Sequence, residues 1–187
     1  MPDYSELELN YARPLADGLI NSGFFRKWFL AGTRYAYDYS LAGPIGKSQS
    51  RLRSPKMKNP YWFNYWCGKD SDCCPCRIGA AIETDILLIL ERDNSRRLAL
   101  HIEIKRPGEG LRVGQAESYP RRAECWVNST TRPRTVPSHQ DFLTTIVCGR
   151  NLGSDPRLGF FDKVVFHDQV ANQLEPYPLM QGRPITG

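Results

Sequence analysis

Long apolar segments are missing from this sequence of 187 residues. A membrane-spanning helix needs about 18 or more consecutive apolar residues, whereas the run from Ile86 to Leu90 is flanked by Asp85 and Glu91. Low-complexity tracts and internal repeats are also missing, which argues against a disordered chain, a collagen-like chain and a coiled coil. The sequence therefore predicts a folded globular protein with no membrane partner.

A secretory signal is not evident either. The first ten residues carry acidic side chains where a signal would carry basic ones, and no apolar segment follows them. We therefore expect a cytoplasmic protein. Because reducing compartments disfavour disulfides, the six cysteines are expected to be metal ligands or thiols. A small secreted, disulfide-bonded protein is the distant alternative.

Positive charge is concentrated in two blocks, within a net charge of +5. Residues 43–60 contain five basic residues and no acidic one, and residues 105–134 contain seven basic and three acidic residues. Such blocks suit a groove for a polyanion, although a solvated loop and a solvated helix face explain them equally well. Residues 43–60 are rich in Gly, Ser and Pro and lack periodicity, so we expect a basic loop or arm there.

The hydrophobic pattern predicts an α/β fold in which a small mixed sheet is flanked by helices, as a single domain over residues 1–187. One or two helices are expected within residues 5–42, with interruptions at Pro14 and Gly23, and residues 61–77 are an aromatic and cysteine-rich insertion. Strands are expected over 82–90, 98–105, 142–148 and 164–166, with a turn at 93–95 and a helix over 112–127.

Ionisable residues stand at informative positions in the two central strands. Glu103 and Lys105 alternate with apolar residues, so they share one face and lie roughly 6–7 Å apart, and strand pairing would bring Asp85 close to them. Carboxylate oxygens are ligands that Mg²⁺ prefers, and a lysine can stabilise charge that develops on a phosphate. The alternative is that Asp85 caps a strand and that Glu103 and Lys105 form an exposed ion pair. His101, on the same face, is expected to be a structural histidine with satisfied hydrogen bonds.

These residues resemble the motif of the PD-(D/E)XK nuclease superfamily, within its RecB-like and lambda-exonuclease-like branch. The resemblance rests on Glu83-Thr84-Asp85, on Glu103-Ile104-Lys105 and on the Gln-x-x-x-Tyr pattern of Gln115 and Tyr119, and it covers residues 77–127. It implies a restriction-endonuclease-like core of order αβββαβ and an enzyme that hydrolyses phosphodiester bonds with Mg²⁺ or Mn²⁺. Thr84 replaces the proline of the family motif, and Pro120 is expected to bend the helix and move Tyr119 away from Gln115.

The resemblance also implies a role for each matching residue. Asp85 and Glu103 would bind the metal with the main-chain carbonyl of Ile104 and an acid from the first helix, Glu6 or Glu8, of which we choose Glu8. Lys105 would be the catalytic lysine, and Gln115 and Tyr119 would line the site and contact the substrate or hold the lysine. The sequence itself offers candidate contacts to DNA phosphates, which are Arg106, Arg112, Arg121, Arg122, Arg51 and Arg53.

Cysteines follow the aromatic run closely, at Cys67, Cys73, Cys74 and Cys76. Four thiolates this close can hold Zn²⁺, and some RecB-like nucleases carry an iron–sulfur cluster, although the spacing here matches neither pattern. Thiols are the alternative, and Cys125 and Cys148 are expected in the core. The aromatic residues 61–66 are also expected mostly in the core, although bases of single-stranded DNA can stack on such side chains.

These features together favour a metal-dependent DNA nuclease, acting either as an exonuclease or as an endonuclease. The alternative is a non-catalytic nucleic-acid-binding module with a cysteine-bound structural metal, in which the acidic residues only support the sheet. A chain of this length is also expected to use a protein partner or a second copy of itself to recognise its target.

Overall fold

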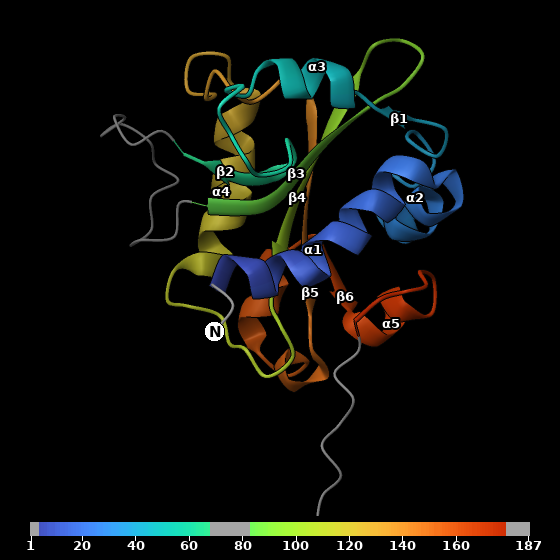
Figure 1. Ribbon diagram of the computed structural model, residues 1–187, viewed down its shortest axis with the longest axis vertical. Helices are drawn as coiled ribbons and strands as arrows, with labels where there is room; N and C mark the ends of the chain where they lie inside the picture. Colours follow the sequence, from blue (N-terminus) through green and yellow to red (C-terminus); the bar gives the residue numbers. More distant parts are fainter. Residues whose placement is uncertain (1–3, 68–82, 179–187) are drawn as a thin grey trace, which may run out of the picture.

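A mixed sheet of six strands forms the centre of the fold (Figure 1). The computed structural model describes residues 4–67 and 83–178. The sheet has the order β1-β3-β4-β5-β6, and β2 also pairs with β3. β1, β2 and β4 run antiparallel to β3, whereas β4, β5 and β6 run parallel to one another. The strands are β1 (Gly43–Pro44), β2 (Phe63–Trp66), β3 (Glu83–Glu91), β4 (Arg97–Ile104), β5 (Asp141–Cys148) and β6 (Lys163–Phe166).

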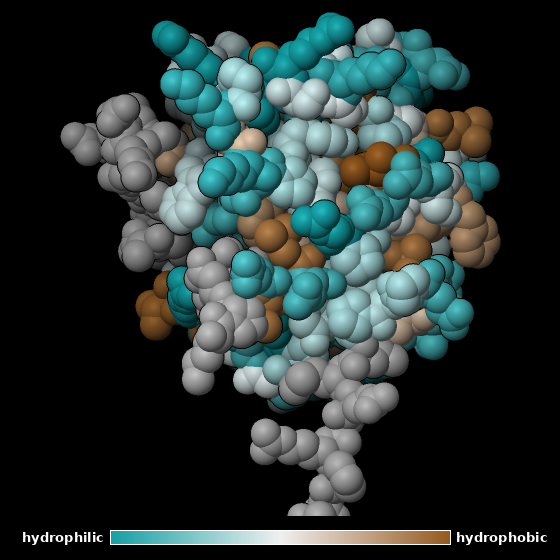
Figure 2. Space-filling model, viewed as in Figure 1, coloured by the Kyte–Doolittle hydropathy of each residue, from teal (hydrophilic) through white to brown (hydrophobic). Residues whose placement is uncertain are grey.

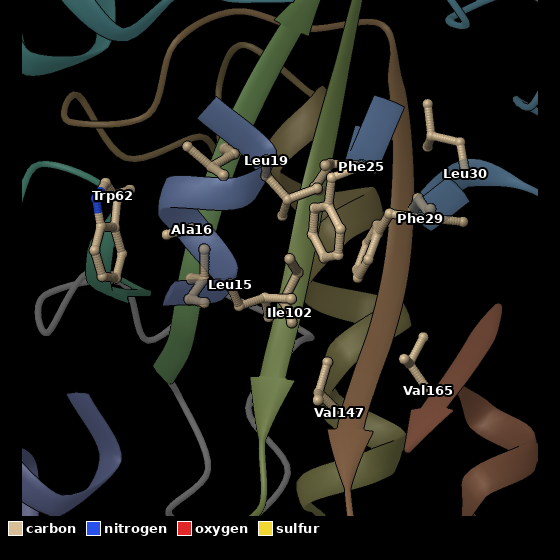
Figure 3. Close-up of a cluster of buried hydrophobic side chains, with 14 of the residues drawn as sticks. Leu15, Ala16, Leu19, Phe25, Phe29, Leu30, Trp62, Ile102, Val147 and Val165 are labelled. Carbon is tan, nitrogen blue, oxygen red and sulfur yellow. The ribbon is translucent and has the colours of Figure 1, made fainter. Parts of the chain in front are cut away.

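Three helices cover one face of this sheet: α1 (Tyr4–Asn21), α2 (Gly23–Leu30) and α5 (His167–Ala171). Apolar side chains of α1 and α2 pack onto strand residues such as Ile102 and Val147 (Figure 3). The interruption expected at Gly23 is confirmed, because Ser22 caps α2 by accepting a hydrogen bond from the Phe25 amide at 3.1 Å. The interruption expected at Pro14 is wrong, since α1 continues through it. Pro14 has no N–H group, so it cannot donate the helical hydrogen bond to the Asn10 carbonyl. Asn10 is exposed, and water can bond this carbonyl instead.

The opposite face is covered by α4 (Gln115–Val127) and by two short 3₁₀ helices, η1 (Arg150–Leu152) and η2 (Pro156–Phe160). α4 connects the parallel strands β4 and β5, which require such a crossover. The helix begins three residues later than expected from the sequence, because Gly114 adopts a left-handed conformation with φ of 75° directly before it.

The expectation of a loop throughout residues 43–60 is wrong. The segment contains β1 and the short helix α3 (Gly46–Arg51). Buried Gln49 holds α3 in place, because its Nε2 donates to the Leu87 carbonyl at 2.7 Å and its Oε1 accepts from the Ile89 amide at 3.3 Å. These two backbone groups lie on β3 between the stretches paired with β1 and with β2, so the amide of Gln49 fills a gap in the sheet edge.

Strands β3 to β6 agree with the sequence pattern, whereas β2 was not expected within the aromatic run. β3 and β4 form the expected hairpin, in which Ile86 opposes Ile102 and Leu90 opposes Leu98, and β5 and β6 lie close to the expected bounds. In the aromatic run, Trp62, Phe63 and Tyr65 are buried as expected, whereas Trp66 is 47% exposed. The part of the insertion from 68 to 77, with Cys73, Cys74 and Cys76, lies outside the described residues.

The surface is consistent with the charged composition. On the face that Figure 2 shows, hydrophobic residues form small separate groups among polar ones. Among the described helices, none is long and apolar enough to cross a membrane.

Candidate active site

Six of the predicted site residues meet where β3 begins and β4 ends: Glu8, Asp85, Glu103, Lys105, Gln115 and Tyr119. Asp85 lies one step beyond the pair of Ile86 and Ile102, which places it opposite Glu103. The Asp85 carboxylate accepts a hydrogen bond from the Ile104 amide at 2.7 Å, and Glu8 of α1 lies close enough to Asp85 for each to affect the pKa of the other. Two acids separated by two positions in a helix face different directions, and Glu6 is exposed. Of the two candidate acids in α1, the structure therefore brings Glu8 to the site.

Glu103 is the most heavily hydrogen-bonded carboxylate in this cluster. It is 1% exposed, and it accepts hydrogen bonds from Gln115 Nε2 at 2.5 Å and from Tyr119 Oη at 2.6 Å. Gln115 and Tyr119 lie one helical turn apart on α4, so both reach the same carboxylate. The expectation that Pro120 separates them is wrong, because α4 continues past the proline without moving Tyr119 from Gln115's side of the helix.

Lys105 completes the cluster from the residue after β4. Its Nζ lies 2.7 Å from Glu103 Oε1 and 3.7 Å from Glu109 Oε1. Its backbone is fixed on both sides, because its amide donates to the Val147 carbonyl at 2.8 Å and its carbonyl lies 2.8 Å from His167 Nε2. Lys105 is only 3% exposed, so its ammonium group is held in place rather than free to sample solvent.

His167 is a contributor that the sequence reasoning missed. Its Nε2 can bond the Lys105 carbonyl only as a donor, so Nδ1 is the acceptor for the Tyr177 hydroxyl at 2.8 Å. The ring also packs against Tyr11 with centroids 4.7 Å apart. Nothing in the local sequence links His167 to Lys105, because the contact joins residues 62 positions apart.

Three acids at this end of the sheet, Asp85, Glu8 and Glu83, have raised pKa values. Burial raises the pKa of Asp85 well above its usual value, and the charges of Glu103 and Glu8 raise it further. Burial likewise raises the pKa of Glu8, and burial together with the charges of Glu8 and Glu103 raises the pKa of Glu83 to about 7. Burial alone lowers the pKa of Lys105, but the charge and hydrogen bond of Glu103 outweigh it, so this pKa is raised. Full ionisation of these acids would place more negative charge at the site than the Lys105 ammonium group balances, so the neutral forms of Asp85, Glu8 and Glu83 are favoured.

The donor chemistry of these residues fits a hard divalent cation. Glu8, Asp85 and Glu103 bring carboxylate oxygens to one end of the sheet, and such oxygens are the ligands that hard divalent cations prefer. Within residues 4–67 and 83–178, no group of three His, Cys, Asp or Glu side chains is already arranged to hold a metal ion. The ligand role expected for the main-chain carbonyl of Ile104 stays a prediction.

The arginines expected to contact DNA fall into two classes. Arg51, Arg112 and Arg121 are exposed, and Arg106 is half-buried beside Glu109 at 3.4 Å. Arg122 is fully buried, with its Nε donating to Thr84 Oγ1 at 2.8 Å, so its expected contact with phosphates does not agree with the structure.

The Arg53 side chain also makes contacts within the fold. It donates to the Phe63 carbonyl at 2.6 Å and stacks over the Tyr65 ring at 4.1 Å.

Two further expectations concern residues beside the site. His101 is buried, but neither ring nitrogen has a hydrogen-bond partner among the described residues, so the expectation of a satisfied histidine is wrong. Cys67 and Cys125 are buried in one cluster with Trp126, and Cys148 is buried in another. The structural metal expected at the cysteine run stays a prediction, because the other three cysteines lie in the part of the chain not described.

Comparisons with known proteins add no further evidence about this site. No family model, no curated protein and no solved structure matches the chain. The side chains that meet at this end of the sheet are therefore the evidence for its function.

Proposed function

We propose that this protein is a nuclease with a restriction-endonuclease-like core that hydrolyses phosphodiester bonds in DNA with Mg²⁺ or Mn²⁺. One observation carries the proposal. Glu8 of α1, Asp85 of β3, Glu103 of β4 and Lys105 directly after β4 converge at one end of the sheet. An ordinary exposed ion pair does not account for this arrangement, because Asp85, Glu103 and Lys105 are at most 5% exposed.

Each residue has a distinct role in this proposal. Asp85, Glu103 and Glu8 would hold the metal, which when bound would supply a water of lowered pKa and neutralise charge on the phosphate. Lys105 would place its ammonium group beside the phosphate oxygen that gains charge during hydrolysis. Gln115 and Tyr119 would keep the Glu103 carboxylate in one orientation through their hydrogen bonds.

Cleavage assays test the proposal directly. Linear and circular DNA, single-stranded and double-stranded, is incubated with the protein in Mg²⁺, in Mn²⁺ and in EDTA. We expect cleavage in the metals and none in EDTA. Lys105→Ala should abolish cleavage while DNA binding stays close to that of the unchanged protein, and Asp85→Asn should weaken Mn²⁺ binding in calorimetry.

Control variants separate chemistry from folding. Lys27→Ala removes an exposed lysine from α2 and should cleave normally. Because Lys105 is buried, Lys105→Met serves as a second variant that retains most of the side-chain volume, and thermal unfolding of each variant is recorded. Normal cleavage by folded Lys105→Met would contradict the assigned role. Zinc in the purified protein with DNA binding but no cleavage would favour a non-catalytic binding module.

A further inference from the structure

One tryptophan at the site is exposed while its aromatic neighbours are buried. In the run from Tyr61 to Trp66, the side chains of Trp62, Phe63 and Tyr65 are at most 4% exposed, whereas Trp66 is 47% exposed. Trp66 is the last residue of β2, and exposure of so large an apolar surface costs free energy. Packing of the core therefore does not explain why a tryptophan stands at this position.

The strand register places the Trp66 side chain beside the acidic cluster. Trp66 pairs with Glu83 across the antiparallel strands β2 and β3, and directly opposed residues point to the same face of a sheet, with Cβ atoms about 5 Å apart. The preceding pair, Tyr65 and Thr84, points toward α4, where Thr84 accepts a hydrogen bond from Arg122. Trp66 and Glu83 therefore lie side by side at the end of the sheet where Asp85 and Glu103 lie.

Glu83, the strand partner of Trp66, connects this tryptophan to the proposed catalytic residues. Glu83 interacts electrostatically with Glu8 and Glu103, and also with Arg112, a side chain exposed in the loop before α4. The next residue, Val113, is 91% exposed. An exposed aromatic ring and an arginine that interacts with Glu83 thus border the carboxylate cluster.

We propose that Trp66 stacks on an unpaired base of single-stranded DNA, whose phosphate backbone passes Arg112 on its way to the acidic site. This inference rests on the proposed nuclease function and names the substrate class of that site. A tryptophan stacks on any base whose face is open, which is the state of bases in single strands, whereas bases inside a duplex stack on each other. Arg112 supplies the sequence-independent attraction to phosphate.

Binding measurements on the full chain test this inference without any need for cleavage. Fluorescence anisotropy in EDTA compares three labelled ligands of equal length: a thymine single strand, the same strand with abasic sites replacing the bases, and a duplex. Because stacking of one base on an aromatic ring is worth about 5- to 150-fold in affinity, Trp66→Ala should weaken binding of the thymine strand by about fivefold or more. It should leave binding of the abasic strand and of the duplex within about twofold.

Two further variants make the result specific. Trp66→Phe keeps an aromatic face and should retain most of the affinity for the thymine strand. Tyr37→Ala removes an aromatic side chain that is 91% exposed near the opposite end of β3, and it should change nothing. Equal losses for the thymine strand and the abasic strand, or no loss for either, would overturn the stacking role.

Failure of this inference is distinguishable from failure of the proposed function. Metal-dependent cleavage with no contribution from Trp66 to single-strand binding would reject the stacking role and leave the nuclease intact. Base-dependent binding through Trp66 with no cleavage in Mg²⁺ or Mn²⁺ would support the stacking role and reject the nuclease.

Discussion

Two buried histidines offer a test of the structure that does not depend on function. His101 lies 5.2 Å from the Trp126 ring and 6.2 Å from the His139 ring, measured between centroids, and its two nitrogens lack partners among the described residues. His167, in contrast, has a partner at each nitrogen. Replacement of each imidazole by leucine should therefore change stability in opposite directions.

The effect of His101→Leu can be worked out from burial and ionisation. A buried polar group without a hydrogen bond costs about 1–3 kcal/mol, so the variant should be more stable than the unchanged protein by a similar amount at pH 7.5. Burial, with smaller contributions from His139 and Arg122, lowers the pKa of His101 well below 6.5. The unfolded chain then binds a proton that the folded chain does not, so stability falls as the pH drops below 6.5.

This ionisation sets the size of the pH effect. Protonation of an unfolded-state imidazole with a pKa of 6.5 costs the fold almost nothing at pH 7.5 and about 2 kcal/mol at pH 5. Leucine has no such cost, so the advantage of His101→Leu should grow by about 2 kcal/mol between these two pH values. For a chain of this length, that increase corresponds to roughly 4–8 °C in melting temperature.

Urea unfolding followed by circular dichroism at pH 7.5 and pH 5 measures both quantities. His167→Leu is the matched control: it leaves the Lys105 carbonyl and the Tyr177 hydroxyl without their partner, so a loss of about 2–4 kcal/mol is expected at pH 7.5. A stability difference between His101→Leu and the unchanged protein that is the same at both pH values would refute the reasoning. It would mean that the His101 ring is already solvated or hydrogen-bonded in solution.

Three further predictions concern the candidate site. Asp85→Asn retains an acceptor for the Ile104 amide and removes a carboxyl group whose pKa is raised by burial. In EDTA the variant should therefore have a higher melting temperature at pH 8, and this gain should shrink toward pH 4. A gain that does not depend on pH would contradict this reasoning. Arg122→Met should lower stability by about 3 kcal/mol and leave the DNA affinity of the remaining folded protein unchanged, as measured by urea unfolding and anisotropy, whereas a selective loss of affinity would mean that Arg122 contacts DNA. Tyr119→Phe removes a hydrogen bond of 2.6 Å to Glu103 and should reduce cleavage about tenfold or more at saturating Mg²⁺ with about 1 kcal/mol lost in stability, and an unchanged cleavage rate would remove the positioning role.

The sequence predicted the features that follow from periodicity. Alternation through Leu98, Leu100 and Ile102 was sufficient to place β4, because one face of this strand packs against α1 and α2 while His101 and Glu103 face α4. Turn residues at 93–95 were sufficient to place the hairpin, and hairpin register then brought Asp85 opposite Glu103. Local pattern and local turn chemistry together thus determined the part of the site that lies on neighbouring strands.

Polar residues that act at long range could not be predicted in this way. Gln49 lies in a polar, basic stretch typical of a loop, and only the tertiary fold reveals the two unpaired backbone groups of β3 that its side chain bonds. Arg122 looks like one of a pair of basic side chains on a helix, yet the side chain points inward to Thr84 while Arg121 is exposed. In both cases the identity of the partner decides the role, and the partner lies about 40 positions away in the sequence.

The position of Glu8 depends on a different part of the fold from the positions of Asp85 and Glu103. Asp85 and Glu103 are set by the rigid β3–β4 hairpin, whereas Glu8 depends on the angle at which α1 crosses the sheet. That angle is fixed at a distance from the site, by Leu15 and Leu19 of α1 and their contacts with the central strands (Figure 3). Because these residues are fully buried, truncation of Leu15 should lower stability and also disturb the contact between Glu8 and Asp85. The core under α1 therefore both stabilises the fold and brings the third carboxylate to the site.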